Sequence, residues 1–227
     1  MKLIHASDSS LLVVFGDTIS GDLHGRVLAL FAALQRRCDP YVRNLHPAYA
    51  SLLVDFDPLR ITHQELSEQL RVLAEAPLAT PALRAEAITI PVCYDAEFGP
   101  DLAEVAAHAG LGVEEVIRLH SSATYFVYFL GFSPGFAYLG GLPEQLRVPR
   151  LPNPRRLVAA GTVAIAGDQA GVYPLDSPGG WRLLGRTPIR MFSPACDPPT
   201  RLQLGDRVKF ASITRSEFLA QQDREAI

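Results

Sequence analysis

Apolar positions recur at two different spacings in the N-terminal part of the chain. Leu11–Gly16 is a compact apolar run and predicts a strand. Ser20 can cap a helix that follows it. The apolar residues of this helix recur at helical spacing: Leu23, Val27, Leu30, Phe31 and Leu34. Tyr41–Leu45 and Ser51–Phe56 then predict two paired strands around His46-Pro47-Ala48.

A second helix and a last strand complete this half. Thr62-His63-Gln64-Glu65 fits a capping box, and the helix that it opens has apolar residues on one face: Leu66, Leu70 and Leu73. Ala87–Val92 predicts the last strand. The resulting order, β-α-β-β-α-β, is the split βαβ pattern of a ferredoxin-like domain. We therefore expect such a domain over residues 1–92.

Residues 93–120 are expected to form a helical connector. Two short helices are predicted within 99–120, because apolar residues recur at helical spacing on both sides of Gly110, which ends the first helix. The second helix ends near His120. The apolar residues that line the two helices are Leu102, Val105 and Ala106, and then Val113, Val116 and Ile117.

The pattern changes after residue 120. Ten of the 17 glycines and 11 of the 18 prolines lie between Gly131 and Pro199. Turn residues there separate short apolar runs: Tyr125–Leu130, Thr162–Ala166, Arg182–Leu184, Ile189–Phe192 and Arg207–Phe210. This pattern is typical of an all-β barrel, which we expect over residues 121–227. Ser216–Ile227 predicts a short polar helix or a frayed tail. The fold class is therefore α+β.

Composition narrows the classes of function. Apolar residues make up 48% of the chain and charged residues 20%, as in soluble globular proteins. The net charge of −3 favours neither a nucleic-acid partner nor a membrane partner. No apolar run approaches the ~20 residues of a membrane helix, and the N-terminus has no signal-peptide pattern. Cys38, Cys93 and Cys196 form no CxxC pair, so we expect no metal site and a cytoplasmic location.

Lysine chemistry has few candidates in this chain. Lys2 and Lys209 are the two lysines among the 21 basic residues. Neither lies in a GxxxxGK[ST] motif, which excludes a P-loop.

Three loop segments carry a family resemblance. They are Gly131–Pro143, Ala159–Gly167 and Gly171–Trp181, and the third is followed by Leu184-Gly185-Arg186-Thr187-Pro188. Together they resemble the KipI / PxpB family, also called allophanate hydrolase subunit 1. The resemblance covers essentially the whole chain, and its specificity comes from the three motifs in this order.

The resemblance implies a fold and an activity. The fold is a ferredoxin-like domain joined to a cyclophilin-like barrel. The activity is that of the B subunit of an ATP-dependent 5-oxoprolinase, which opens 5-oxo-L-proline to L-glutamate; this subunit is inactive alone. The implied partners are a PxpC/KipA-type subunit, in direct contact, and a PxpA-type subunit. The implied cofactor is ATP, bound with magnesium, on this chain or elsewhere in the complex.

Two other functions remain open from the same resemblance. KipI itself inhibits a sporulation histidine kinase, so the chain could be a regulator that binds a sensor kinase. A fused relative forms the carboxyl-transfer part of urea carboxylase, so a component of an allophanate or urea amidolyase-type enzyme is the other alternative.

Gly131-Phe132-Ser133-Pro134-Gly135 matches the G-x-S-x-G pattern of serine hydrolases. That mechanism uses the backbone N–H after the serine as an oxyanion donor, and proline has none. No histidine follows residue 120, although the α/β-hydrolase order requires one after the serine. We therefore expect a turn that aims Phe132 and Phe136 at a pocket or partner, or a barrel corner packed with aromatic side chains.

His120 is the candidate catalytic residue. It matches the histidine of the family's V-I-x-x-H stretch, here Val116-Ile117-Arg118-Leu119-His120, and a histidine can relay protons near neutral pH. The structural alternative is a histidine at a helix end, hydrogen bonded to backbone carbonyls.

The candidate binding residues lie in the same loops. Ser177-Pro178-Gly179-Gly180-Trp181 predicts a type II turn with positive φ at Gly179, which could hold an anion on backbone N–H groups or simply close a hairpin. Arg155 and Arg186 suit a carboxylate, because guanidinium binds it through two parallel hydrogen bonds. The full set is Phe132, Pro134, Gly135, Arg155, Gln169, Tyr173, Ser177, Gly179, Gly180, Trp181 and Arg186.

Overall fold

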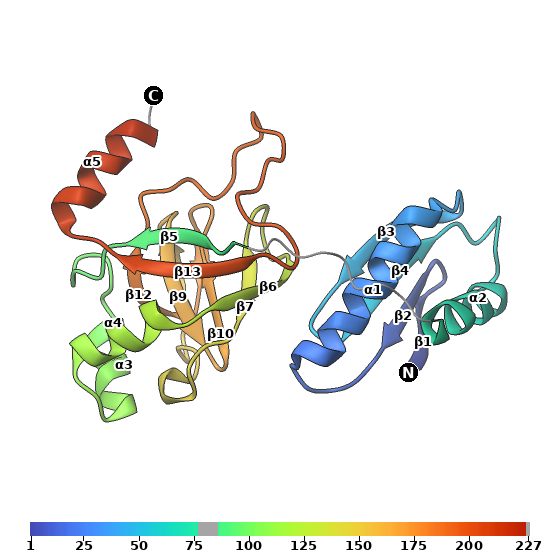
Figure 1. Ribbon diagram of the computed structural model, residues 1–227, viewed down its shortest axis with the longest axis horizontal. Helices are drawn as coiled ribbons and strands as arrows, with labels where there is room; N and C mark the ends of the chain where they lie inside the picture. Colours follow the sequence, from blue (N-terminus) through green and yellow to red (C-terminus); the bar gives the residue numbers. More distant parts are fainter. Residues whose placement is uncertain (77–85, 226–227) are drawn as a thin grey trace. The chain divides into compact units, whose positions relative to one another are not determined.

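The computed structural model describes residues 1–76 and 86–225. The chain divides into two compact units, Met1–Leu83 and Arg84–Ile227. Each unit has its own sheet and its own apolar core, so each is described by itself (Figure 1).

The first unit contains a four-stranded antiparallel sheet. Its strands are β1 (Lys2–Ser7), β2 (Ser10–Val14), β3 (Val42–Pro47) and β4 (Ser51–Phe56), in the order β1-β2-β4-β3. Side chains of β2 and β4 alternate between buried and half-buried positions. This alternation gives the sheet one apolar face, as the sequence pattern predicts for a half-buried strand.

Helices α1 (Gly21–Arg37) and α2 (His63–Glu75) cover that face. Both predicted caps are confirmed. The Ser20 hydroxyl accepts a hydrogen bond from the Leu23 N–H, and Thr62 and Glu65 form a reciprocal capping box. The core between helices and sheet contains Val27, Leu30 and Leu34 of α1, Leu66 and Leu70 of α2, and Leu11, Val13, Leu52, Val54 and Phe56 of the sheet.

The predicted β-α-β-β-α-β order of residues 1–92 is wrong at its two ends. A strand that the pattern did not indicate, β1, pairs with β2 at the sheet edge. Its side chains are mostly exposed, so it has no apolar alternation to detect. The predicted last strand exists as β5 (Ile88–Val92), but it pairs in parallel with β13 (Arg207–Ser212) in the second unit.

The second unit is built on a seven-stranded sheet in the order β12-β9-β10-β7-β6-β13-β5. A pair of backbone hydrogen bonds between Cys93 and Arg186, each 2.9 Å, joins the end of β5 to β12. The two edges of the sheet are therefore connected, and the sheet closes into a barrel. Figure 1 shows β5 and β13 side by side along the barrel. The predicted all-β barrel is confirmed in this form.

The remaining strands are short. They are β6 (Tyr125–Leu130), β7 (Ala137–Gly140), β8 (Arg155–Val158), β9 (Thr162–Ala166), β10 (Gln169–Val172), β11 (Ser177–Gly179) and β12 (Arg182–Arg186), with a 3-10 turn at Glu144–Leu146. β8 and β11 pair with each other outside the main sheet.

Three helices complete the unit: α3 (Leu102–Ala109), α4 (Val113–Ser122) and α5 (Arg215–Glu225). Gly110 ends α3 with φ of 66°, as predicted. Residues 93–120 are not a separate connector, because Leu102, Val105 and Val116 belong to the barrel core. α5 is the predicted C-terminal helix, and it is anchored by Phe218, which packs on Phe98 with ring centroids 4.5 Å apart.

The predicted strand at Ile189–Phe192 is wrong. The Ile189 N–H donates to the Thr187 hydroxyl at 3.3 Å, and the Met191 carbonyl accepts from the Arg201 N–H at 2.9 Å. The segment therefore forms only an isolated bridge, between Phe192 and Thr200, and no strand of the sheet. Pro188 and Pro194 flank the segment, and proline cannot donate to a sheet. The apolar side chains of this loop line a cleft instead.

Candidate functional site

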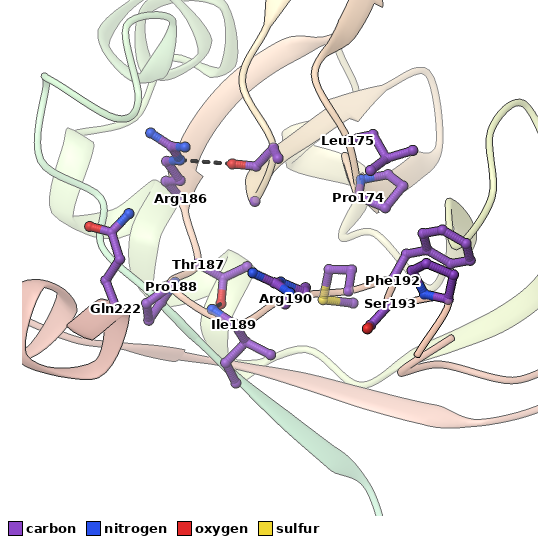
Figure 2. Close-up of a pocket in the computed structure, with 14 residues that line it drawn as sticks. Pro174, Leu175, Arg186, Thr187, Pro188, Ile189, Arg190, Phe192, Ser193 and Gln222 are labelled. Carbon is purple, nitrogen blue, oxygen red and sulfur yellow. Dashed lines mark hydrogen bonds between the residues drawn. The ribbon is translucent and has the colours of Figure 1, made fainter. Parts of the chain in front are cut away.

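An open cleft of about 620 Å³ lies at the end of the barrel where β12 leaves the sheet (Figure 2). Four parts of the chain line it: residues 160–161, 174–175 and 186–194, and Gln222 of α5. The first three come from, or directly follow, the loop segments that carry the family resemblance. The fold therefore brings these segments together around one cavity.

Gly161 holds the wall of this cleft together. Its N–H donates to the Tyr173 carbonyl at 2.7 Å, and its carbonyl accepts from the Thr187 N–H at 2.9 Å. Its φ is +82°, and an added Cβ would lie 2.5 Å from the Thr187 carbonyl oxygen. Glycine is required here for both the left-handed backbone and the close approach of the neighbouring loop.

Two arginines supply the positive charge of the cleft. Arg186 ends β12, and its Nε donates to the Ala160 carbonyl at 2.8 Å. Arg190 lies exposed on the loop that follows. No acidic residue is among the described residues that line the cleft. Asp176 lies near one edge, where its Oδ1 accepts from the Ala160 N–H at 2.8 Å.

A cluster of aromatic side chains packs under the neighbouring loops. Phe136, Tyr173 and Trp181 are all buried, and the ring of Phe136 contacts both others edge-on, with centroids 5.3 and 5.6 Å apart. Burial raises the pKa of the Tyr173 phenol. The Arg150 guanidinium lies 5.8 Å from the ring centroid of Trp181. Edge-on pairs of this kind fix the loops from which they come, so Trp181 is a core residue rather than a stacking platform for a ligand.

The predicted turn at Ser177–Trp181 has a different conformation. Ser177–Gly179 forms β11, and Gly179 does not have a positive φ. The type II turn is therefore wrong. Glycine is needed at 179 for space, since a Cβ there would collide with the Tyr173 hydroxyl. Gly180 accepts from the Leu151 N–H at 2.7 Å.

The Gly131–Phe136 turn places Phe132 at the surface. Phe132 has φ of +68° and is 62% exposed, with its ring edge-on to Phe136 and Tyr173. Pro134 is exposed and Gly135 is buried. A Cβ on Gly135 would lie 2.7 Å from the Phe192 Cβ, so this turn packs on the loop that lines the cleft. The predicted turn is present, but Phe136 is buried in the aromatic cluster and neither Phe132 nor Phe136 lines the cleft.

Arg155 forms an internal ion pair and does not line the cleft. Its Nη2 lies 2.6 Å from Oδ1 of Asp101, a residue only 4% exposed. The other oxygen of Asp101 accepts from the Leu183 N–H at 2.8 Å. The pair ties the start of α3 to β8 and β12. Gln169 begins β10, at the opposite end of that strand from the cleft.

His120 lies in the barrel core, away from the cleft. The residue is fully buried, its ring stacks on Phe210 with centroids 4.6 Å apart, and its Nδ1 lies 2.7 Å from the Tyr94 hydroxyl. Burial lowers the pKa of the imidazole to about 3. A neutral histidine without solvent contact cannot relay protons to a ligand in the cleft. The structural alternative is supported, although the partner is a tyrosine rather than a backbone carbonyl.

The structure thus separates the predicted site residues into groups. Arg186 lines the cleft, while Phe132, Pro134, Gly135 and Tyr173 lie in segments beside it. Arg155, Gln169, Ser177, Gly179, Gly180, Trp181 and His120 do not line it. The sequence reasoning missed Arg190 and the loop around it. Its run of apolar residues indicates a strand, and only the flanking prolines point to a loop.

Two classes of feature are absent from the described part of the chain. In residues 1–76 and 86–225, no group of three or more His, Cys, Asp or Glu side chains could hold a metal ion. No helix in the same ranges is long and apolar enough to cross a membrane.

Comparisons with known proteins identify the class and the family. The family model of the carboxyltransferase domain, subdomain C and D, matches residues 1–202. The B subunit of 5-oxoprolinase from Bacillus subtilis is 39% identical over 230 residues, covering 95% of this chain and 94% of that protein. The B subunit of 5-oxoprolinase from Escherichia coli O157:H7 is 58% identical over 123 residues, covering 54% of this chain and 56% of that protein. The chain belongs to this carboxyltransferase-domain family, in its KipI / PxpB branch.

Several solved structures share the fold of this chain. The crystal structure of TTHA0988 matches with a TM-score of 0.79 and 41% identity, covering 90% of this chain but 40% of that longer one. PH0987 from Pyrococcus horikoshii matches over 96% of this chain and 100% of its own, with 44% identity and a TM-score of 0.58. The Kluyveromyces lactis urea amidolyase shares the fold at 20% identity, with a TM-score of 0.79, and the match covers 96% of this chain and 15% of that one.

Proposed function

We propose that this chain is the B subunit of an ATP-dependent 5-oxoprolinase, which opens 5-oxo-L-proline to L-glutamate in the cytoplasm. The observation that carries the proposal is the 39% identity to a protein of that name over 95% of this chain and 94% of the relative. The match is therefore to a whole subunit, including the loops around the cleft. A third protein of the same name, from Haemophilus influenzae, is 43% identical over 162 residues.

The cleft by itself lacks the groups that the reaction needs. Its described lining contains hydroxyl groups from Thr187 and Ser193 but no His, Cys, Asp or Glu side chain. A hydroxyl without a neighbouring base is a weak nucleophile and a poor proton acceptor. This composition favours a subunit whose catalytic groups come from a partner, which we take to be a PxpC/KipA-type subunit in direct contact.

The chemistry explains why ATP and further subunits are required. The ring amide of 5-oxoproline is a stable bond, so its opening needs activation. Transfer of the γ-phosphoryl group of ATP to the amide oxygen releases ADP and makes the ring carbon more electrophilic. Water adds to that carbon, the C–N bond breaks with the ring nitrogen leaving as the amine, and a second water hydrolyses the resulting acyl phosphate to glutamate and phosphate. The absence of a GxxxxGK[ST] motif in the sequence favours binding of ATP and magnesium elsewhere in the complex. A PxpA-type subunit completes the proposed assembly.

The test is ATP-dependent release of glutamate from 5-oxo-L-proline by this chain co-purified with PxpC-type and PxpA-type subunits. We expect activity with all three and none when any one is omitted. Turnover by this chain alone would contradict the shared site. A stable complex without activity would transfer the assignment to another amide, such as a urea-derived one, and the absence of any complex would favour the kinase-binding alternative.

A further inference from the structure

We propose that the cleft beside β12 is a complete binding site for one small anion, a carboxylate or phosphate group on a compact and partly apolar body, held by Arg186 and Arg190. The identification of this anion with the carboxylate of 5-oxo-L-proline rests on the proposed function. The anion preference itself rests on the geometry of the cleft.

Arg186 is held in an orientation that suits an anion. Its Nε–H is already used by the Ala160 carbonyl, at 2.8 Å. Figure 2 shows this bond as a dashed line from Arg186. The two terminal amino groups have no other hydrogen-bond partner in the described chain. A guanidinium fixed at Nε loses little freedom when its terminal groups bind a planar anion through two hydrogen bonds.

Arg190 has no carboxylate partner in the described residues, unlike half of the other 18 arginines. Nine others have a carboxylate oxygen within 3.7 Å in the described residues: Arg37, Arg43, Arg60, Arg71, Arg118, Arg147, Arg155, Arg182 and Arg215. Arg190 has no hydrogen bond or ion pair in that part of the chain and lines the cleft. With Arg186 it gives this cavity two positive charges and no lining carboxylate, in a protein whose net charge is −3. This local field favours an anion.

The other lining groups limit what the anion is attached to. Leu175, Ile189 and Phe192 contribute apolar surface, together with the rings of Pro174, Pro188 and Pro194. Figure 2 shows Pro174 and Leu175 across the cavity from Ile189 and Arg190. A cavity of about 620 Å³ accommodates a ring of five or six atoms with its charged group. Apolar walls around a charged end are the usual composition of sites for small metabolites.

Helix α5 gives the cleft a polar edge. Gln222 lines it from α5. The start of this helix is fixed by a capping box between Thr214 and Glu217 and by an ion pair of 3.0 Å between Arg215 and Glu97. An amide on an anchored helix can donate to a ligand oxygen and accept from a ring N–H. Gln222 is therefore the third residue assigned to the site.

The test is calorimetric titration of the purified chain with 5-oxo-L-proline, inorganic phosphate and ATP. 2-Pyrrolidinone, which has the same ring without the carboxylate, is the matched neutral probe. We expect an anion to bind and 2-pyrrolidinone not to bind. Competition separates the two sources: binding of 5-oxo-L-proline that excess phosphate does not displace identifies a carboxylate site, and binding of phosphate and ATP without 5-oxo-L-proline identifies a phosphate site.

Two variants test the residues. Arg186→Lys keeps the charge but loses the planar fork, and Arg190→Gln removes a charge that has no internal partner. Each is expected to weaken anion binding about tenfold or more. Arg118→Gln, which removes an exposed arginine on α4 paired with Glu115, is the charge-matched control and should bind as the parent does. If Arg186→Lys does not fold, Arg190→Gln alone decides.

Anion binding that both arginine variants leave unchanged would overturn the site, as would the absence of binding by the purified chain. These outcomes are distinct from failure of the proposed function. A three-subunit complex without oxoprolinase activity, combined with arginine-dependent anion binding, would reject the function and keep the site. An active complex with arginine-independent binding would reject the site and keep the function.

Discussion

The Tyr94 hydroxyl lies 2.7 Å from Nδ1 of His120, inside the apolar core of the second unit. His120 is on α4 and Tyr94 follows the end of β5, so their hydrogen bond joins helix and sheet across the core. Phe210 of β13 stacks on the same imidazole. Only a neutral histidine can occupy this position without a large cost, because a charged ring would have no water and no carboxylate partner.

This burial predicts how stability depends on pH. The pKa of His120 is lowered to about 3 in the folded chain by desolvation, from 6.5. Between these values the unfolded chain binds a proton that the folded chain does not, so the free energy of unfolding falls as the pH falls from 6.5 toward 3. The expected slope from this residue is roughly 1 kcal/mol per pH unit. Urea unfolding at pH 7 and pH 4.5 measures it.

The variant His120→Phe should reduce this pH dependence. It removes the titrating group but keeps the stacking on Phe210, at a cost of about 1–2 kcal/mol at pH 7 for the unpaired Tyr94 hydroxyl. His24, whose pKa burial also lowers, belongs to the first unit and is unchanged in the variant. An equal pH dependence in parent and variant would show that His120 titrates normally.

Neutralising Asp101 should lower the free energy of unfolding more than neutralising Glu115, which belongs to an exposed ion pair. It is 4% exposed and bonds both Arg155 and the Leu183 N–H. Asp101→Asn leaves Arg155 without its counter-charge and should lower the free energy of unfolding by about 2–3 kcal/mol. Breaking a fully buried ion pair would lower it more, but the Arg155 side chain is 30% exposed. Glu115→Gln, which breaks the exposed pair with Arg118, should cost less than about 1 kcal/mol. If chemical denaturation gave equal losses of stability for the two variants, the Asp101–Arg155 pair would not have this structural role.

Gly161→Ala tests the wall of the cleft. The substitution adds a Cβ 2.5 Å from the Thr187 carbonyl oxygen at a φ of +82°. Gly167→Ala is the matched control, because Gly167 also has a positive φ but nothing within 4 Å of the added atom. We expect the Gly167→Ala control to lower the free energy of unfolding by about 1 kcal/mol, from backbone strain alone. Gly161→Ala should lower the free energy of unfolding clearly more and should also weaken ligand binding. Calorimetry measures the stability and the ligand affinity of both variants.

Phe132 combines a left-handed backbone with an exposed aromatic ring. Asparagine tolerates this conformation better than phenylalanine does, so Phe132→Asn should leave the melting temperature of the isolated chain unchanged or slightly higher. The loss of an exposed aromatic anchor should weaken binding to the proposed PxpC-type partner about tenfold. Leu59→Asn, which changes the 94% exposed Leu59 of the first unit, is the control. Unchanged affinity in the Phe132 variant would remove this residue from the interface.

Much of the fold could be predicted from local patterns. Both helices of the first unit follow from their apolar spacing and from caps at Ser20 and Thr62, because a cap involves residues only three positions apart. Tyr125–Leu130 and Thr162–Ala166 have the predicted strand bounds. The strand at 2–7 could not be found, because an edge strand with exposed side chains has no apolar pattern.

The site was predictable only in part. The sequence identified three loop segments, and two of them, together with the stretch that follows the third, contribute to the cleft. It did not separate Arg186, which lines the cavity, from Arg155, which pairs with Asp101, a residue 54 positions away. Nor did it show that His120 points into the core. A side chain's direction at a helix end depends on what packs against that helix, and residue type does not encode this.

The sequence by itself determined the helices, most barrel strands and the family resemblance, since each depends on neighbouring residues or on motif order. The tertiary structure decided that the strand at 88–92 belongs to the barrel, where it pairs with a strand more than a hundred residues later. It also decided that Arg190 joins Arg186 around one cavity. These pairings join residues far apart in the sequence, and they are determined by the free energy of closing the barrel and burying its core. A local sequence pattern therefore does not predict them.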